Sequence, residues 1–201
     1  MNKLDVVKKA IKEYPDFPKK GILFQDIFGV LLDPEANLAL NDLAMEHVKE
    51  HSDNFDKIVG LDSRGFLFGN TMALAVRKPF VPIRKKGKLP GRCISVAYSL
   101  EYGEDVLEIQ EGSIQPGDRV LIVDDLLATG KNEHEHHLTT SYNFGALYLL
   151  TGGTLTAAAS LIKKTGGVVD HCWVVIELAV LRGREKTWEK ITSLISLEDV
   201  E

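Results

Sequence analysis

The feature that most constrains the fold is an uninterrupted apolar run, Val120–Val123, which follows Arg119 and ends in two adjacent acidic residues. A strand that is apolar at every position is typical of a parallel sheet whose two faces are both covered by helices. Gly117-Asp118 supplies a turn before the run, and Asp124-Asp125 follows it. We therefore expect a central parallel strand over 119–123, with both carboxylates at its carboxyl end.

Strand and helix patterns alternate along the rest of the chain. Strands are runs of β-branched and aromatic residues between turns, whereas helices repeat apolar residues every three to four positions. The prolines and glycine of 15–24 indicate a loop. Alternating strands and helices predict an α/β fold with a mostly parallel sheet flanked by helices. Helices are expected over 4–11, 35–51 and 66–76 and from Thr154 onward, and strands over 57–61, 80–84, 94–100, 106–110 and within 168–178, the last clear strand.

Size and composition place the chain among ordinary globular proteins. Its 201 residues fit a single domain, 1–201, that can bury a core without disulfides. A net charge of −5 argues against a nucleic-acid binder, which needs a basic face, and no apolar run approaches the roughly 20 residues that span a bilayer. Neither nucleic acid nor membrane is therefore an expected partner. The first residues lack a secretory pattern, and Cys93 and Cys172 are expected to be reduced thiols, so we expect a cytoplasmic location.

The acidic pair and the residues after it suit the binding of a sugar phosphate. Ligands bind at the carboxyl ends of strands in open α/β sheets, and the first N–H groups of a following helix attract phosphate. Paired carboxylates suit ribose hydroxyls or a hydrated Mg²⁺. The plainer alternative is that Asp124 and Asp125 cap a helix. A Walker-type phosphate loop is excluded, because the sequence G-x-x-x-x-G-K-[ST] does not occur.

Five segments, all in family order, resemble the adenine-type members of the type I phosphoribosyltransferases. The segment VDDLLATG (123–130), completed by GGTL (152–155), resembles the family's motif for phosphoribosyl pyrophosphate, PRPP. The resemblance runs from near the N-terminus to LRGREK at 181–186. The four segments that narrow the match to the adenine type are PDFP…GILF (15–24), GLDSRGFLFG (60–69), IRKKGKLPG (83–91) and YSLEYG (98–103).

This resemblance implies a type I core with a small hood, the hood and termini comprising 1–34 and about 179–201. It implies a purine-salvage enzyme that transfers ribose 5-phosphate from PRPP to adenine, giving AMP and pyrophosphate, with Mg²⁺ and as a homodimer. Adenine, PRPP, AMP and pyrophosphate are thus the expected small-molecule partners. Salvage transferases for hypoxanthine, guanine or orotate are disfavoured by the segments at 60–69 and 98–103.

The resemblance also assigns roles to residues of the matching segments. It assigns no certain protein ligand to the metal, since Mg²⁺ arrives with PRPP and water could link it to Asp124 and Asp125. The expected roles are PRPP or ribose-phosphate binding for Asp124, Asp125, Ala128, Thr129, Gly130, Gly152, Gly153 and Thr154; pyrophosphate binding for Arg64, Arg84, Lys85 and Lys88; adenine binding for Leu23 and Phe24; and catalysis for Glu101 and Tyr102.

Each of these roles has a plainer alternative. A guanidinium such as that of Arg64 holds phosphates well but also forms surface ion pairs, and the basic turn at 84–92 could be a solvated loop. Glu101 lies in the family's mobile loop, where a carboxyl beside the base could move a proton at adenine N7, or it is an exposed strand-end residue. Phe24 resembles the hood aromatic that packs on adenine, or it is a core side chain. Gln25 stands where the family often has arginine, so we assign it no role.

An insertion splits the PRPP motif. The family reads Ala-Thr-Gly-Gly-Thr continuously, whereas here about 22 residues, 131–152, separate Gly130 from Gly153, far more than ordinary connections. Either the insertion loops out and leaves Thr129-Gly130 beside Gly153-Thr154, or Thr151–Thr154 rebuilds the phosphate site alone. Gly153 and Thr154 contribute in both geometries. A third outcome is a damaged site, since a shift of about 1 Å can cost on the order of 10² in rate.

The inserted sequence contains His134, His136 and His137. Three close histidines raise a metal hypothesis, but neither an HExxH pair nor a distant Cys/His partner supports it, so a polar loop is favoured. Beside the active enzyme, a second hypothesis stays open: a PRPP- or AMP-binding regulator, or an insertion-impaired isoform, that keeps the fold with little turnover. A regulator would be expected to gain a nucleic-acid-binding module or to lose Glu101 and the basic loop, and this sequence shows neither change.

Overall fold

The computed structural model describes residues 2–17, 23–100, 103–127, 152–178 and 189–197. The strands of its main sheet are β3 (Lys57–Leu61), β4 (Phe80–Lys85), β5 (Cys93–Leu100), β6 (Gly103–Gln110), β7 (Arg119–Leu127), β8 (Val168–Leu178) and β9 (Ile191–Leu197). Their order across the sheet is β5-β6-β4-β3-β7-β8-β9. The five strands from β4 to β9 are parallel, and β6 and β5 extend the sheet as an antiparallel hairpin. The predicted α/β fold is confirmed.

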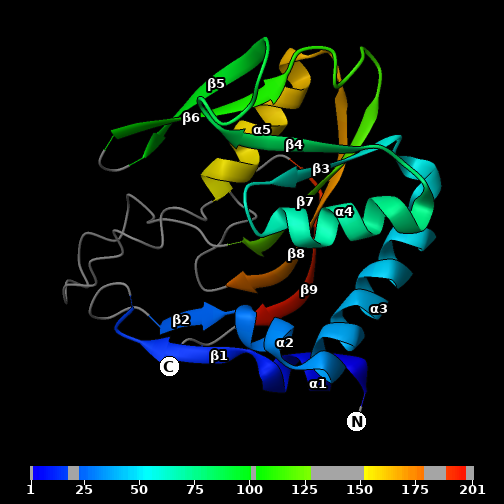
Figure 1. Cartoon of the computed structure of the whole chain (residues 1–201), viewed down its shortest axis with the longest axis vertical. Coiled ribbons are helices and arrows are strands. Elements are labelled where there is room, and N and C mark those ends of the chain that lie inside the picture. Colours follow the sequence, from blue (N-terminus) through cyan, green and yellow to red (C-terminus); the bar gives the residue numbers. More distant parts are fainter. Residues whose placement is uncertain (1, 18–22, 101–102, 128–151, 179–188, 198–201) are drawn as a thin grey trace.

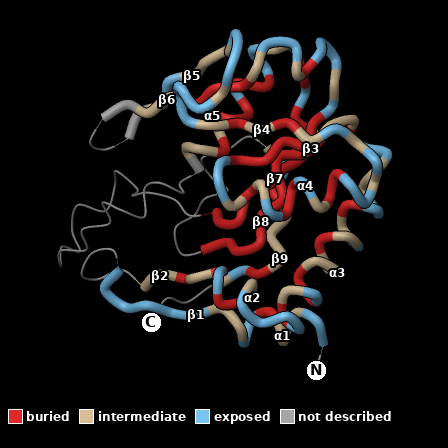
Figure 2. The backbone as a smooth tube through the Cα atoms, viewed as in Figure 1, coloured by how far each residue is buried: buried red, intermediate tan, exposed pale blue. Residues whose placement is uncertain are grey.

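Helices cover both faces of this sheet (Figure 1). They are α1 (Lys3–Ala10), α2 (Phe28–Leu32), α3 (Pro34–Glu50), α4 (Gly65–Val76) and α5 (Gly152–Lys164), with a 3₁₀ turn at Ser52–Asn54. One buried core packs α1, α3 and α4 on the face that carries Trp173. A second core packs α5 on the other face through Leu155 and Leu161. Because β7 lies between the two cores, it is buried from Val120 to Leu127, as Figure 2 shows, and apart from Asp124 and Asp125 these buried residues are apolar.

The start of α3 follows directly from its sequence. Asp33 Oδ1 accepts hydrogen bonds from the Glu35 N–H at 2.9 Å and the Ala36 N–H at 3.2 Å. These are among the N–H groups that a helix leaves unpaired at its first turn. Pro34 occupies the first turn, where its missing N–H costs nothing. The helix therefore begins where the sequence predicted it.

Four strands differ from the prediction. β7 continues to Leu127, so the acidic pair lies inside the strand and not after it. β1 (Lys12–Pro15) and β2 (Leu23–Asp26) form an antiparallel pair where a loop was expected. β9 adds a further parallel strand, so 168–178 is not the last one. β1 is exposed at all four positions, and β9 lies at one of the two edges of the sheet. Strands defined by pairing more than by burial give a weak apolar signal.

The N-terminal elements β1, β2, α1 and α2 lie together at one end of the molecule, next to β9 (Figure 1). They fall within the residues 1–34 that were expected to form part of the hood. β9, which falls in the range expected for the hood and termini at the other end of the chain, forms the edge of the main sheet. In the described part of the chain no helix is long and apolar enough to cross a membrane. Cys93 and Cys172 are both free thiols, as expected.

Candidate functional site

Asp124 and Asp125 are buried near the carboxyl end of β7, with 6% and 3% of their surface exposed. The Asp125 N–H donates to Asp124 Oδ1 at 2.9 Å. Burial, and then the neighbouring Asp125, raise the pKa of Asp124 well above its ordinary value. Burial also raises the pKa of Asp125, with Arg64 opposing the rise. Because two adjacent buried carboxyls do not both ionise readily, the pair retains a proton at pH values where exposed aspartates have lost theirs.

Arg64 reaches the acidic pair from the loop between β3 and α4. Its Nε lies 2.8 Å from Asp125 Oδ2. Gly65, the next residue, begins α4 against the backbone of β7, where a Cβ on Gly65 would lie 2.4 Å from Val123 O and 3.2 Å from Asp124 Cα. Only glycine permits this approach. It brings the N-terminus of α4, with its partial positive charge, beside the carboxylates.

Arg84, near the end of β4, links the same loop to the basic turn. Arg84 Nε donates to Asp62 Oδ2 at 2.9 Å, and Arg84 Nη1 donates to Lys88 O at 3.1 Å. The Lys88 N–H in turn donates to Lys85 O at 3.2 Å. The cationic side chains expected to bind pyrophosphate therefore come from the loop before α4 and from the end of β4 with the turn after it, and the Asp62–Arg84 contact joins these two segments.

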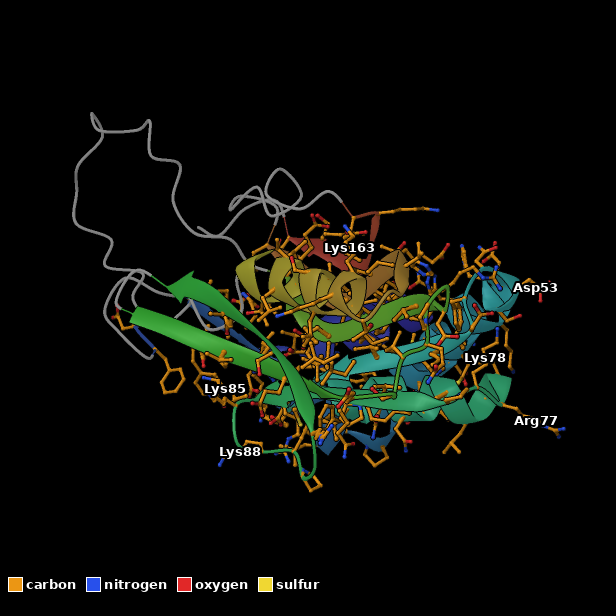
Figure 3. The ribbon with its side chains drawn as sticks, turned by 90° about the horizontal axis from the view of Figure 1, so that it is seen from above. Asp53, Arg77, Lys78, Lys85, Lys88 and Lys163 are labelled. Carbon is orange, nitrogen blue, oxygen red and sulfur yellow. The ribbon has the colours of Figure 1, made fainter. Side chains whose placement is uncertain are left out.

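Two carboxylates of β6 contact the basic turn. Glu108 is 7% exposed, and its Oε2 accepts a hydrogen bond from the Gly87 N–H at 2.9 Å. Asp105 Oδ2 lies 2.6 Å from Lys85 Nζ. Figure 3 shows Lys85 beside the β5–β6 hairpin and Lys88 on the turn next to it. The turn is thus anchored at both its main chain and one lysine side chain.

The helix α5 begins at Gly152, two residues earlier than expected, so Gly152, Gly153 and Thr154 form its first turn. A helix that connects two parallel strands runs back along the sheet, so α5 starts at the edge where β7 ends (Figure 1). Among the described residues, Thr154 Oγ1 and Asp125 Oδ1 are buried without a hydrogen-bond partner. Thr154 lies near Tyr98, but not in hydrogen-bonding geometry. Buried oxygens without partners are uncommon, so each of the two has hydrogen-bonding capacity left for a polar ligand.

The expected adenine-binding residues lie on β2. Neighbouring residues of a strand point to opposite faces, so the side chains of Leu23 and Phe24 cannot both contact one ligand. The Phe24 ring meets the Phe17 ring edge-on, with centroids 5.2 Å apart. Gln25 is buried, and its Nε2 donates to Glu13 Oε1 at 3.0 Å.

Several expected site residues lie outside the described residues, and their roles stay predictions. No group of three or more His, Cys, Asp or Glu side chains in the described ranges could hold a metal ion. The expectations outside these ranges are those for Glu101, Tyr102, Ala128, Thr129 and Gly130, and for His134, His136 and His137 within the insertion.

Sequence reasoning missed three carboxylates around the basic turn: Asp62 and Asp105 pair with cationic side chains, and Glu108 accepts a hydrogen bond from the main chain of the turn. Glu108 carried at most a weak signal, since a glutamate between Leu107 and Ile109 fits the ordinary alternation of apolar and polar residues in a strand with one solvent-facing side. Only the structure shows that Glu108 is buried and therefore needs partners. Asp62 and Asp105 carried no comparable signal, because acidic residues near strand ends are common on protein surfaces.

Known proteins resemble this chain over nearly its whole length. The family model described as phosphoribosyl transferase domain matches residues 30–132, so the match ends just inside the insertion. The adenine phosphoribosyltransferase of Drosophila pseudoobscura pseudoobscura is 48% identical, over 96% of this chain and 95% of that relative. Adenine phosphoribosyltransferase 1 of Triticum aestivum is 46% identical, over 92% of this chain and 88% of that relative.

Solved structures give the same result for the fold. The adenine phosphoribosyltransferase of Saccharomyces cerevisiae, complexed with adenine and an imino-altritol bisphosphate, is 38% identical with a TM-score of 0.80, over 96% of this chain and 98% of that one. The enzyme of the same name from Thermoanaerobacter pseudethanolicus is 41% identical with a TM-score of 0.78, over 96% and 99% of the two chains.

Proposed function

The chain belongs to the adenine phosphoribosyltransferases of the type I phosphoribosyltransferase family, and from this premise we propose how its residues carry out the reaction. It is a purine-salvage transferase that moves ribose 5-phosphate from PRPP to adenine, giving AMP and pyrophosphate. The reaction breaks the bond between ribose C1 and pyrophosphate and forms one between C1 and adenine. The protein must therefore hold a sugar phosphate, a pyrophosphate and a base in fixed relation.

The observation that carries the proposal is the buried Asp124-Asp125 pair near the carboxyl end of β7. Asp125 uses Oδ2 for Arg64 and leaves Oδ1 unpaired among the described residues. An ionised carboxylate is an acceptor only, so this oxygen suits a ribose hydroxyl as donor. Asp124 and Asp125 thus orient the ribose ring at the edge of the sheet where the helix N-termini lie.

Arg64, Arg84, Lys85 and Lys88 hold the pyrophosphate. Arg64 and Arg84 are fixed by Asp125 and Asp62, each with N–H groups left for phosphate oxygens. The two lysines contribute point charges on flexible stems. Positive charge at these positions stabilises the leaving pyrophosphate as it gains charge in the transition state.

The first turn of α5 holds the 5′-phosphate. Gly152 and Gly153 let the backbone approach the phosphate, and Thr154 adds its buried hydroxyl. Because this turn is already helical, Gly152–Thr154 can bind phosphate through the helix N-terminus without the first half of the motif. Ala128, Thr129 and Gly130 are proposed as additional contacts.

Adenine binds against the hood, with the Phe24 ring on the base and main-chain groups of Leu23 at its edge. Glu101 and Tyr102 close the site from the β5–β6 connection. Glu101 holds or exchanges a proton at adenine N7, and closure keeps water from the oxocarbenium-like ribose.

The residues present fit Mg²⁺ as a cation shared with the substrate. Mg²⁺ usually keeps several waters and binds through one or two carboxylates together with substrate phosphates. The unpaired Asp125 Oδ1 and its neighbour Asp124 supply such carboxylates, and no cage of three ligands is found among the described residues. Asp124 and Asp125 would hold the cation through water. When bound, the cation offsets charge on the leaving pyrophosphate.

The enzyme acts as a cytoplasmic homodimer in this proposal. Support for a second copy comes from large apolar side chains that are exposed on α2, α3 and α4, since large apolar exposure favours an interface. Those side chains are Phe28, Leu32, Leu38, Leu67 and Leu74. Two free thiols agree with a reducing compartment.

A steady-state assay of AMP formation from adenine and PRPP tests the proposal. It compares the intact chain with a variant lacking Lys131–Gly152, in which Gly130 joins Gly153 and the motif is continuous. We expect AMP from both forms. Asp124→Asn serves as the control within the site, and it should lower kcat/KM roughly 10- to 150-fold, because a hydrogen bond to a charged group contributes about 1.5–3 kcal/mol.

The assay separates the alternatives. Activity in the deletion variant alone would identify the intact chain as an insertion-impaired isoform. If neither form made AMP while both bound PRPP, the regulator hypothesis would replace the enzyme.

A further inference from the structure

The strand β6 places two carboxylates in contact with the basic turn at 84–92. Glu108 lies opposite Arg84 in the β4–β6 pairing, and Asp105 lies three residues earlier, opposite Tyr98 of β5. Glu108 contacts the main chain of the turn, and Asp105 contacts the side chain of Lys85. The two carboxylates therefore act on different parts of the same turn.

The main chain of the turn is held in place. Glu108 accepts from the Gly87 N–H at 2.9 Å and from Ser95 Oγ at 3.3 Å. The Lys86 N–H donates to Val106 O at 2.9 Å. Two of these bonds join the turn to β6, and the bond from Ser95 holds Glu108 against β5. A change of partner at Lys85 therefore needs only a rotation of its side chain.

The carboxylate of Asp105 is held by contacts that do not involve Lys85. Its Oδ1 accepts from the Val106 N–H at 2.9 Å, and Tyr98 Oη donates to its Oδ2 at 3.4 Å. The Asp105 side chain is 20% exposed and that of Lys85 is 51% exposed, with 2.6 Å between Lys85 Nζ and Asp105 Oδ2. The carboxylate is thus the fixed partner and the lysine the movable one.

We propose that Asp105 competes with pyrophosphate for the Lys85 ammonium. Asp105 pairs with Lys85 while the pyrophosphate site is empty and releases it when pyrophosphate or PRPP binds. The inference rests on the proposed role of Lys85 in pyrophosphate binding. Each binding event must break the ion pair, and the bound phosphates then lie near a like charge. Asp105 therefore lowers the affinity for pyrophosphate groups and recaptures Lys85 as the product leaves.

The expected size of the effect follows from the exposure of the pair. Partly exposed ion pairs alter an equilibrium by about two- to fivefold. The repulsion between Asp105 and phosphate adds to this at low salt and fades as ions screen it. A carboxylate that only braced the hairpin would act in the opposite direction, because its loss would loosen the turn and weaken binding.

The test is calorimetric titration of inorganic pyrophosphate, with Mg²⁺, into the full chain and its Asp105→Asn variant. Asparagine keeps the shape and an acceptor for the Val106 N–H but removes the charge, and Asp105→Ser provides a second variant. We expect pyrophosphate to bind about two- to fivefold more tightly to the variants at low salt, with a smaller gain at high salt. The KM for PRPP should fall with it, while kcat stays equal or decreases.

The matched control is Glu111→Gln, which removes one negative charge at the exposed end of the same hairpin. This control should leave pyrophosphate affinity within error of the unchanged chain. An equal gain in Glu111→Gln would overturn the inference, because the effect would then come from net charge and not from the Lys85 contact.

The Lys85→Gln variant distinguishes a failure of the inference from a failure of the pyrophosphate-binding role on which it rests. If Lys85→Gln binds pyrophosphate as tightly as the unchanged chain, the proposed role of Lys85 fails and the inference fails with it. If Lys85→Gln binds more weakly, that role stands, and adding Asp105→Asn to it should bring a smaller gain than in the unchanged chain, because the ion pair is already absent and only the salt-screened repulsion between Asp105 and phosphate is removed. Weaker or unchanged binding by Asp105→Asn alone would then overturn the inference while leaving the role of Lys85 intact.

Discussion

At the scale of single residues, the site includes a position so closely packed that only one residue type fits it. Gly65 is the clearest case, because it sets how closely α4 approaches β7 and therefore where Arg64 meets Asp125. The motif at 60–69 predicted that Arg64 would serve the site. It did not predict that the residue beside Arg64 must be a glycine because of the Val123 carbonyl.

Gly65→Ala should destabilise the fold and weaken PRPP binding together. Its added Cβ would meet Val123 O at 2.4 Å, which only a shift of backbone can relieve, and overpacking of this kind costs about 1–3 kcal/mol. Urea unfolding measures the stability and titration with PRPP measures the affinity. Gly69→Ala in the same helix is the control, since the closest contact of its Cβ would be the Phe80 side chain, at 2.9 Å, with the nearest backbone atom at an ordinary 3.6 Å. Equal losses in both variants would contradict the argument.

At the scale of elements, the groups proposed to bind the ribose and its phosphates meet at the carboxyl end of β7. The strand delivers Asp124 and Asp125, α4 begins beside them, and α5 starts at the same edge of the sheet. The apolar run Val120–Val123 was enough to predict the strand and its central position in the sheet. Its extension to Leu127 was not predicted, because two carboxylates in a row normally end a buried strand.

PRPP binding should release protons from the carboxyl groups of Asp124 and Asp125. Burial raises the pKa of both Asp124 and Asp125, so the empty pair holds protons that exposed carboxyls would lose. Ribose hydroxyls and the cation bound with PRPP favour the ionised form, so affinity should rise with pH and fall as pH decreases. Calorimetric titration of PRPP in two buffers of different ionisation enthalpy measures the release. Asp124→Asn should reduce it, and identical heats in both buffers would exclude it.

At the scale of the whole molecule, a second set of titratable groups lies near the amino end of β8, away from the site. His47 Nε2 and His171 Nε2 are 2.9 Å apart, and His171 Nδ1 lies 2.6 Å from Asp170 Oδ2. Burial, and then His171, His51 and Lys190, lower the pKa of His47 to about 4. This cluster joins α3 to the main sheet, so its protonation state affects the stability of the fold and not the chemistry directly.

The free energy of unfolding should therefore decrease in mild acid. The pKa of His47 is about 4 in the folded chain against 6.5 for an ordinary histidine, so the unfolded chain binds the extra proton between these values. Stability is then complete above about pH 6.5 and is lost as pH falls toward about 4. Because His47 is partly exposed, we expect a loss of only about 1–2 kcal/mol. Urea unfolding at several pH values measures it, and His47→Gln should flatten the curve more than His51→Gln, which removes only a lesser cause of the low His47 pKa.

The sequence alone determined the α/β class, the central strand, the family and the candidate site residues. It could do so because apolar runs, glycines and phosphate-binding segments are local patterns whose meaning does not depend on distant neighbours. The tertiary structure alone decided that Arg64 pairs with Asp125, Arg84 with Asp62 and Lys85 with Asp105. It also decided that β9 completes the sheet. These features join residues far apart in the chain, and only the packing of the sheet and its two helical layers brings them within hydrogen-bonding distance.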